Sequence, residues 1–251
     1  MPITKYLSIL VVSATAILAG CGNDDDNIIQ DQGPDALYEL GLENMDNGNF
    51  PIALAYFQAL EARFPFSNVT RQAQLEMIYA YYRNREPELA VAQAEEFERE
   101  NPTHPRIDYC LYMKGLAYFD EEPNIIEKMF RADLTERPPR DTMLAFSIFQ
   151  ELLRRFPTSQ YTPDSRERMI YLRNRLATYE NHVAVHYLER GAYVAAINRA
   201  KYSLEHFPGA PALEESLQIM IEAYELLGMI DLADDARRVL HASFDEFAAT
   251  E

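Results

Sequence analysis

Residues 53–65 read ALAYFQALEARFP and residues 145–157 read AFSIFQELLRRFP. Both segments place alanine, phenylalanine, leucine and a closing Phe-Pro at the same offsets. A small residue such as Ala53 or Ala145 lets one helix approach another closely, because it leaves room for a large side chain opposite. A proline ends one helix and begins the next. The two segments therefore predict two copies of one helix-pair unit.

Two further segments fit this pattern and also end at a proline. Their matching positions are Tyr81, Ala90, Ala94 and Phe97 before Pro102, and Ala184, Tyr187, Ala196 and Ala200 before Pro208. A weaker fifth unit runs through Tyr224, Ala233 and Leu240. The pattern resembles the tetratricopeptide repeat, a helix–turn–helix of about 34 residues. We expect an all-α tetratricopeptide-repeat superhelical solenoid of about five helix pairs, with an irregular helical bundle as the alternative.

The repeat pattern departs from regularity in two places. Gly41 precedes Ala53 by 12 residues, whereas Gly115 precedes Ala145 by 30, which predicts an insertion of about 18 residues at 120–141. Such an insertion is either functional or a tolerated loop. Residues 163–188 contain no helix breaker after Pro163 and predict one or two linking helices. We therefore divide the repeats into 34–162 (repeats 1–3) and 163–251 (a linking helix and repeats 4–5).

The N-terminus has the features of a secretion signal. Lys5 is the only charged residue among the first 23, and an apolar run follows it as far as Ala19. Leu18-Ala19-Gly20-Cys21 resembles a bacterial lipobox, which implies a signal peptide at 1–20 and diacylglycerol and N-acyl lipid on Cys21. The alternative is an ordinary secretory signal with an incidental cysteine. Residues 21–33 contain too few apolar groups to fold and predict a flexible tether.

The composition limits the classes of partner. The formal net charge of −17 argues against nucleic acid and against a body that lies flat on anionic lipid. The chain has two cysteines, so Cys110 is left without an internal partner and is expected in the core.

The search for catalytic motifs finds little support for an enzyme. His182 and His186 are spaced i,i+4 with Glu189 three residues further, which could place all three on one helix face. The segment lacks the glutamate that a metalloprotease needs as a base after the first histidine. No phosphate-binding glycine loop, nucleophile elbow or Cys-x-x-Cys occurs. We predict no catalytic residue, no metal and no cofactor other than the lipid.

A binding surface has better support. Transferring the register of the tetratricopeptide repeat to the first helix of each unit predicts side chains that face a concave groove. These are Tyr38, Leu42, Leu75, Tyr79, Tyr82, Arg83, Tyr109, Tyr112, Leu116 and Phe119. Aromatic side chains offer a large apolar contact at low entropy cost, which suits an extended peptide. The alternative is that several of these residues pack between adjacent repeats.

Several stretches resemble the BamD (ComL) family, the lipoprotein subunits of the outer-membrane β-barrel assembly machinery. They are Leu75–Tyr82, Asn101–Tyr109, Ser159–Thr162, Tyr187–Ala195 and Asn198-Arg199. The resemblance covers the whole chain and implies a scaffold on the periplasmic face of the outer membrane. It implies that repeats 1–3 receive unfolded outer-membrane proteins and that repeats 4–5 hold the subunit BamA, with Arg199 at that contact. The chain departs from the family pattern in having no tryptophan.

The repeat by itself does not identify a partner. The rival hypothesis is therefore a tetratricopeptide-repeat adaptor lipoprotein of another periplasmic complex, such as one that coordinates cell-wall synthesis.

Overall fold

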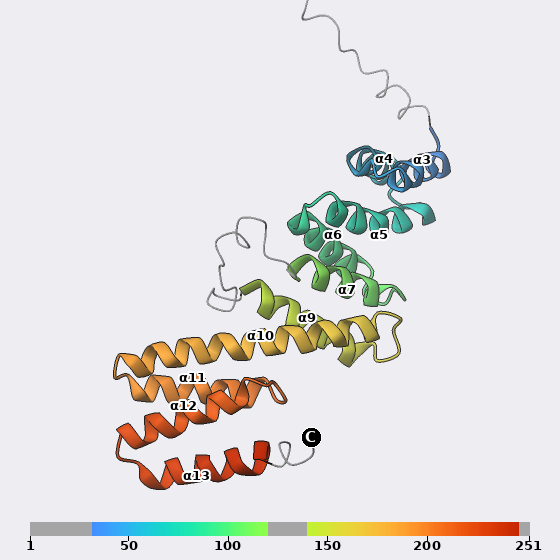
Figure 1. The fold of residues 1–251 in the computed structure, drawn as a ribbon. Coiled ribbons are helices and arrows are strands. Elements are labelled where there is room, and N and C mark those ends of the chain that lie inside the picture. Colours follow the sequence, from blue (N-terminus) through green and yellow to red (C-terminus); the bar gives the residue numbers. More distant parts are fainter. Residues whose placement is uncertain (1–31, 120–139, 246–251) are drawn as a thin grey trace, which may run out of the picture. The chain divides into compact units, whose positions relative to one another are not determined.

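The computed structural model describes residues 32–119 and 140–245, and within these ranges it is helical with no strand. The helices are shown in Figure 1. Their bounds are α3 (Pro34–Asp46), α4 (Phe50–Arg63), α5 (Asn68–Arg83), α6 (Pro87–Glu100), α7 (Ile107–Tyr118), α9 (Arg140–Arg155), α10 (Thr162–Glu189), α11 (Tyr193–His206), α12 (Leu213–Leu226) and α13 (Ile230–Leu240), followed by a π-helical turn at His241–Asp245.

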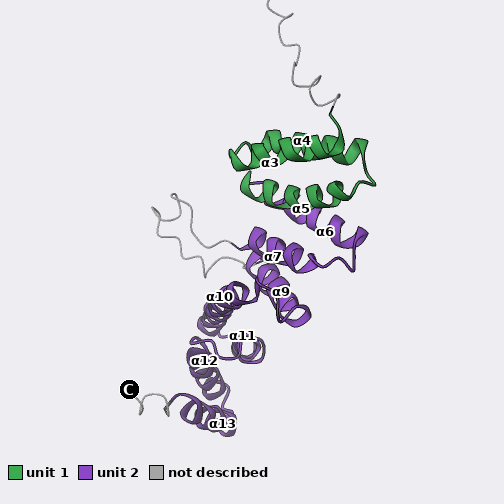
Figure 2. Cartoon of the chain, turned by 90° about the vertical axis from the view of Figure 1, so that its right-hand side faces the viewer, with its two compact units in different colours: residues 1–84 green, residues 85–251 purple. Residues whose placement is uncertain are grey.

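The chain forms two compact units, residues 1–84 and 85–251, coloured separately in Figure 2. The first unit holds α3, α4 and α5, which pack against one another. In the second, α7 packs on α6 and α9, and α10 packs on α9, α11 and α12. α12 also packs on α11 and α13. None of the described helices combines the length and the apolar character needed to cross a bilayer.

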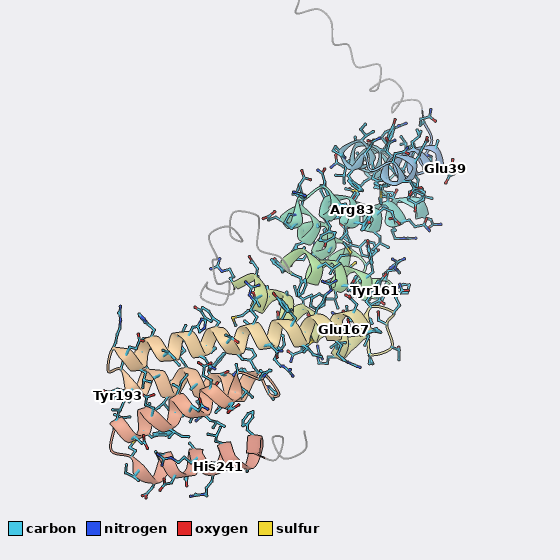
Figure 3. The ribbon with its side chains drawn as sticks, in the orientation of Figure 1. Glu39, Arg83, Tyr161, Glu167, Tyr193 and His241 are labelled. Carbon is cyan, nitrogen blue, oxygen red and sulfur yellow. The ribbon has the colours of Figure 1, made fainter. Side chains whose placement is uncertain are left out.

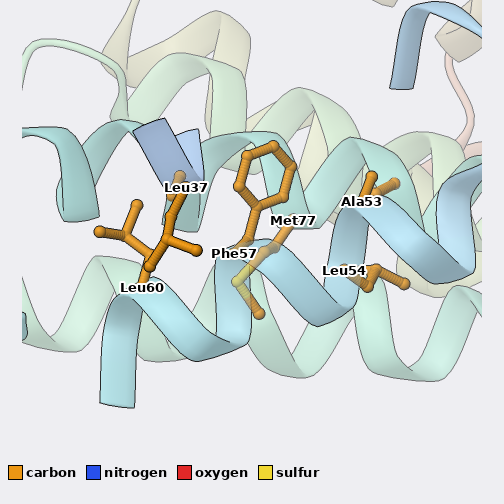
Figure 4. Close-up of a cluster of buried hydrophobic side chains, with 8 residues drawn as sticks. Leu37, Ala53, Leu54, Phe57, Leu60 and Met77 are labelled. Atoms are coloured by element: carbon orange, nitrogen blue, oxygen red, sulfur yellow. The ribbon is translucent and has the colours of Figure 1, made fainter. Parts of the chain in front are cut away.

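The core of the first unit explains the repeat pattern. Phe57 is fully buried among Leu37, Ala53, Leu60 and neighbouring side chains, as Figure 4 shows. Its ring lies over Gly41 of α3, where an added Cβ would be 2.3 Å from the ring carbon Cε1. Only glycine leaves room for the ring, so the spacing between glycine and phenylalanine specifies how α3 and α4 pack.

The second unit repeats this arrangement in α7 and α9. Phe149 is fully buried with Ala145 and Leu172, and a Cβ added to Gly115 would lie 2.5 Å from Cε1 of Phe149. The alanine and phenylalanine positions predicted from the two quoted segments are thus buried in both units. The glycine supplies the matching space on the partner helix.

The Phe-Pro junctions at Phe64 and Phe156 share one hydrogen bond, in which a threonine hydroxyl donates to the phenylalanine carbonyl. The Thr70 hydroxyl donates to the Phe64 carbonyl at 2.7 Å, and the Thr162 hydroxyl donates to the Phe156 carbonyl at 3.0 Å. An arginine covers the phenylalanine ring in each case, with Arg63 5.0 Å from the Phe64 centroid. These bonds satisfy carbonyls at a helix end that would otherwise lack partners. The two junctions therefore orient the helix that follows in the same way.

The turn inside a helix pair is also repeated. Gly48, Gly191 and Gly228 have φ between 71° and 75°, a left-handed conformation that glycine adopts without a steric penalty. Arg85, between α5 and α6, has a φ of 64° and is the described non-glycine residue with this conformation. The helix pairs α3–α4, α10–α11 and α12–α13 therefore each reverse direction through one left-handed glycine.

The segment predicted as one or two linking helices is the single helix α10, 28 residues long (Figure 1). It carries buried Leu172, Leu176 and Ala177 on its packed faces. The fully buried Asn181 donates to the Ala212 carbonyl at 2.7 Å and to Glu215 Oε2 at 2.9 Å, and it accepts from the Ser216 hydroxyl at 2.6 Å. This network sets the register of α12 against α10.

Cys110 of α7 is fully buried, as its apolar neighbours predict. The predicted signal peptide, Cys21 and most of the tether lie outside the described residues. So does the predicted insertion at 120–141, apart from its last two residues, Arg140 and Asp141, which begin α9. The predicted boundary between residues 162 and 163 divides the repeats according to the partner expected for each part. This boundary stays a prediction.

Candidate binding surfaces on the repeat helices

The predicted groove residues divide between the two units, and those of the second unit form an aromatic cluster between α7 and α10. The Tyr112 ring stacks on Tyr161 with centroids 4.5 Å apart, and Tyr109 lies 6.0 Å from the same ring. Tyr161 immediately precedes α10 (Figure 3). Phe119 meets Tyr171 edge to face at 5.7 Å. Tyr171 remains 42% exposed, so the cluster reaches the surface.

Two arginines lie on this aromatic cluster. The Arg106 guanidinium is 4.7 Å from the Tyr109 centroid, and the Arg168 guanidinium is 4.6 Å from the Phe119 centroid. A guanidinium over an aromatic face is attracted by the ring quadrupole. The result is a surface that combines large apolar area with positive charge. Such a surface suits a peptide with aromatic and acidic groups.

Asp164 links α7 to α10 within the cluster through hydrogen bonds with a side chain of each helix. It accepts hydrogen bonds from the Tyr112 hydroxyl at 2.8 Å and from Arg168 Nε at 2.7 Å. Partial burial alone would raise the pKa of Asp164, but the hydrogen bonds from Arg168 and Tyr112 and the charge of Arg168 hold this pKa below its usual value. Burial, and then the hydrogen bond to Asp164, raise the pKa of Tyr112 to about 12. The cluster is therefore held in one geometry before any partner binds.

Sequence reasoning placed Tyr109, Tyr112 and Phe119 in this region but missed Tyr161, Tyr171, Arg168 and Asp164. Asp164, Arg168 and Tyr171 belong to α10, most of which the sequence assigned to a linking segment, whereas Tyr161 lies at the end of the predicted repeats 1–3. The spacing of Asp164, Arg168 and Tyr171 at i, i+4 and i+7 was the available signal, since it places them on one face. Leu116 packs against the Phe149 core and is half-buried.

In the first unit, Tyr38 and Leu42 are half-buried against the Phe57 core, with the Tyr38 and Phe57 centroids 6.0 Å apart. Burial, and then the charge of Glu76, raise the pKa of Tyr38. Tyr38 and Leu42 therefore follow the alternative prediction in part, because one side of each residue packs between helices.

In the first unit, the exposed Arg83 lies beside two aromatic rings. Its guanidinium lies 5.2 Å from the Phe50 centroid and 5.4 Å from the Tyr79 centroid, and it donates a hydrogen bond to the Tyr79 hydroxyl. Tyr82 is half-buried. Figure 3 shows the position of Arg83 on α5. This unit therefore carries the same combination of arginine and aromatic rings.

Leu75 requires a correction. It was predicted to line the groove, but it is only 6% exposed. Leu75 therefore belongs to the packing and is removed from the set that faces a partner.

Arg199 lies on α11 against a buried carboxylate. Its Nη1 is 3.2 Å from Glu180 Oε2, and its side chain is 45% exposed while that of Glu180 is 8% exposed. Burial alone would lower the pKa of Arg199, but the hydrogen bond and charge of Glu180 raise it. One edge of the guanidinium is thus fixed, and the exposed remainder can meet a partner.

His182 and His186 line an open cavity of about 540 Å³ on α10 and α12. The lining also includes Tyr179, Tyr187, Glu189 and Glu215. Among the described residues, no group of three or more metal-ligating side chains could hold a metal ion.

The helix pairs, their glycine-phenylalanine contacts and their left-handed turns define a helical-repeat protein of the tetratricopeptide class. The family model described as "YfiO: Outer membrane lipoprotein" matches residues 30–239. The chain belongs to the BamD family.

The chain is similar over nearly its whole length to proteins named "Outer membrane protein assembly factor BamD". It is 36% identical to that of Vibrio cholerae over 236 residues, covering 94% of this chain and 98% of the relative. It is 38% identical to that of Neisseria meningitidis, covering 94% of this chain and 90% of the relative. It is 39% identical to that of Neisseria gonorrhoeae, covering 94% of this chain and 88% of the relative.

Proposed function

We propose that this chain is a non-enzymatic scaffold of the β-barrel assembly machinery, held by lipid on Cys21 at the periplasmic face of the outer membrane. Its first 20 residues act as a signal peptide, and residues 21–33 act as a tether. Membership of the BamD family supports this proposal, since the relatives are named as outer membrane protein assembly factors.

The scaffold binds unfolded outer-membrane proteins through repeats 1–3. The observation that carries this assignment is the aromatic surface formed by Tyr109, Tyr112, Phe119 and Tyr161, to which Tyr171 of the linking helix α10 is added. Arginines on Tyr109 and Phe119 add positive charge to it. An extended segment with aromatic side chains would bury its rings on this surface, and the arginines would attract acidic groups beside them.

Repeats 4–5 bind BamA, with Arg199 at the contact. Glu180 holds one edge of the Arg199 guanidinium, so the free edge is oriented for a carboxylate on BamA. Pre-orientation reduces the entropy that binding would otherwise cost.

Site-specific photocrosslinking in cells tests both assignments. A photoreactive residue in place of Tyr171 should capture unfolded outer-membrane proteins, and one in place of the exposed Asn198 should capture BamA. The exposed Glu167, also on α10, serves as a control position for the first. Capture of cell-wall enzymes, with no β-barrel protein at either position, would instead support the rival adaptor function.

A further inference from the structure

One face of α10 runs from the aromatic cluster to the cavity beside His182. Asp164, Arg168, Tyr171, Arg175, Tyr179, His182 and His186 follow one another at spacings of three or four residues. Residues at these spacings share a face of an α-helix. α10 is uninterrupted over this length (Figure 1). The two surfaces are therefore parts of one continuous strip along a single helix.

The chemistry changes along this strip. At the N-terminal end, Arg168 covers Phe119 and pairs with Asp164, so aromatic contact dominates there. At the C-terminal end, the cavity of about 540 Å³ is lined by two carboxylates, Glu189 and Glu215, and by no lysine or arginine. Arg199 does not line this cavity, and one edge of its guanidinium pairs with Glu180.

Two features of the cavity suit a cationic side chain. Tyr179 and Tyr187 supply aromatic rings, which attract a cation over their faces. The Glu215 carboxylate is held by a hydrogen bond of 2.9 Å from Asn181, which is itself fully buried. A carboxylate fixed in this way loses little freedom when it pairs with an ammonium or guanidinium group.

We propose that this cavity binds a lysine or arginine side chain of the same extended segment that places its aromatic residues on the α7–α10 cluster. This inference rests on the proposed function. The helix rises about 1.5 Å per residue, so Arg168 and His182 are separated by about 21 Å along its axis. An extended chain advances about 3.4 Å per residue, so the basic residue should follow or precede the aromatic anchor by about six positions.

Binding of fluorescent peptides to the purified chain tests the proposal. The probe is a twelve-residue peptide with a pair of aromatic residues and one lysine six positions away, and fluorescence anisotropy gives its affinity. Changing that lysine to glutamine should weaken binding about tenfold, the effect of losing a charge-assisted hydrogen bond. Moving the lysine to three or nine positions from the aromatic pair should weaken binding to a similar extent.

Variants of the chain identify the cavity as the site. Glu215→Gln keeps an acceptor for Asn181 but removes the charge, and it should weaken the lysine peptide about tenfold while leaving the glutamine peptide unchanged. Glu214→Gln is the matched control, because Glu214 is exposed and does not line the cavity. Equal effects of Glu215→Gln on both peptides would overturn the inference. If neither peptide binds the unmodified chain, the proposed function itself fails, and if both bind equally, only the cation site fails.

Discussion

The exposed guanidinium of Arg199 lies 3.2 Å from the buried carboxylate of Glu180. This pair joins α11 to α10, so Arg199 has a structural role whether or not a partner is bound. A loss of function on replacing Arg199 therefore has two possible origins, and a stability measurement separates them.

Arg199→Leu should lower the free energy of unfolding by about 2 kcal/mol, because Glu180 is left buried without its cation. The exposure of Arg199 keeps this cost below that of a fully buried pair. Urea denaturation followed by circular dichroism measures the change. The double variant Arg199→Leu/Glu180→Gln should recover most of the loss. Stability of the single variant equal to that of the parent chain would contradict the assignment.

Gly41→Ala and Gly115→Ala should each destabilise the chain by about 2 kcal/mol, since the new Cβ meets a buried phenylalanine ring. Combining Gly41→Ala with Phe57→Leu should cost less than the sum of the two separate changes, because the smaller side chain makes room. Gly33→Ala is the matched control, since no atom lies within 4 Å of its added Cβ. Thermal unfolding distinguishes these variants.

The Tyr112–Asp164 contact predicts a loss of stability at high pH. The pKa of Tyr112 is raised to about 12 in the folded chain, from an ordinary value of 10.0. Its stabilising contribution is therefore complete below pH 10 and is lost as pH rises from 10 to 12. Tyr112→Phe should flatten this part of the pH–stability curve. A curve unchanged by the substitution would contradict the prediction.

Asn181→Leu should destabilise the chain by about 2 kcal/mol, because it removes the hydrogen bonds that this fully buried amide makes with the Ala212 carbonyl, the Glu215 carboxylate and the Ser216 hydroxyl. Asn174→Leu is the comparison on the same helix, at a position that is not fully buried. Hydrogen exchange at α12 should rise in the Asn181 variant alone, since α12 loses the contact that fixes its register. Uniform exchange in the two variants would argue against a register role.

The repeat core was predictable because few residue types satisfy its packing. Ala53 and Phe57 recur as Ala145 and Phe149 at equal spacing, and burial of all four confirms the pairing of helices. Family membership was predictable for a related reason, since the quoted stretches extend beyond what the generic repeat requires. The family match over residues 30–239 confirms that prediction.

The surface was only partly predictable, because the exposure of a side chain depends on which neighbouring elements cover each turn of its helix. Leu75 lies in the same helix as Tyr79 and Tyr82, yet it is buried while they remain half-exposed. These three positions are spaced i, i+4 and i+7 and share one face of α5, so the difference in burial comes from what packs against each turn of the helix. Tyr161 and Tyr171 were missed because their role depends on α10 being one helix packed beside α7, and the sequence also allowed two helices there.

The burial of Cys110 has a consequence for handling the protein under oxidising conditions. Burial is the main cause that raises the pKa of this thiol to about 12. At neutral pH only about one molecule in 10⁵ then carries the reactive thiolate. Cys110 should therefore resist oxidants and alkylating reagents while α7 stays packed, and it should react once the second unit opens. The thiol of Cys110 thus reports unfolding of the second unit, and the mass shift after alkylation measures it.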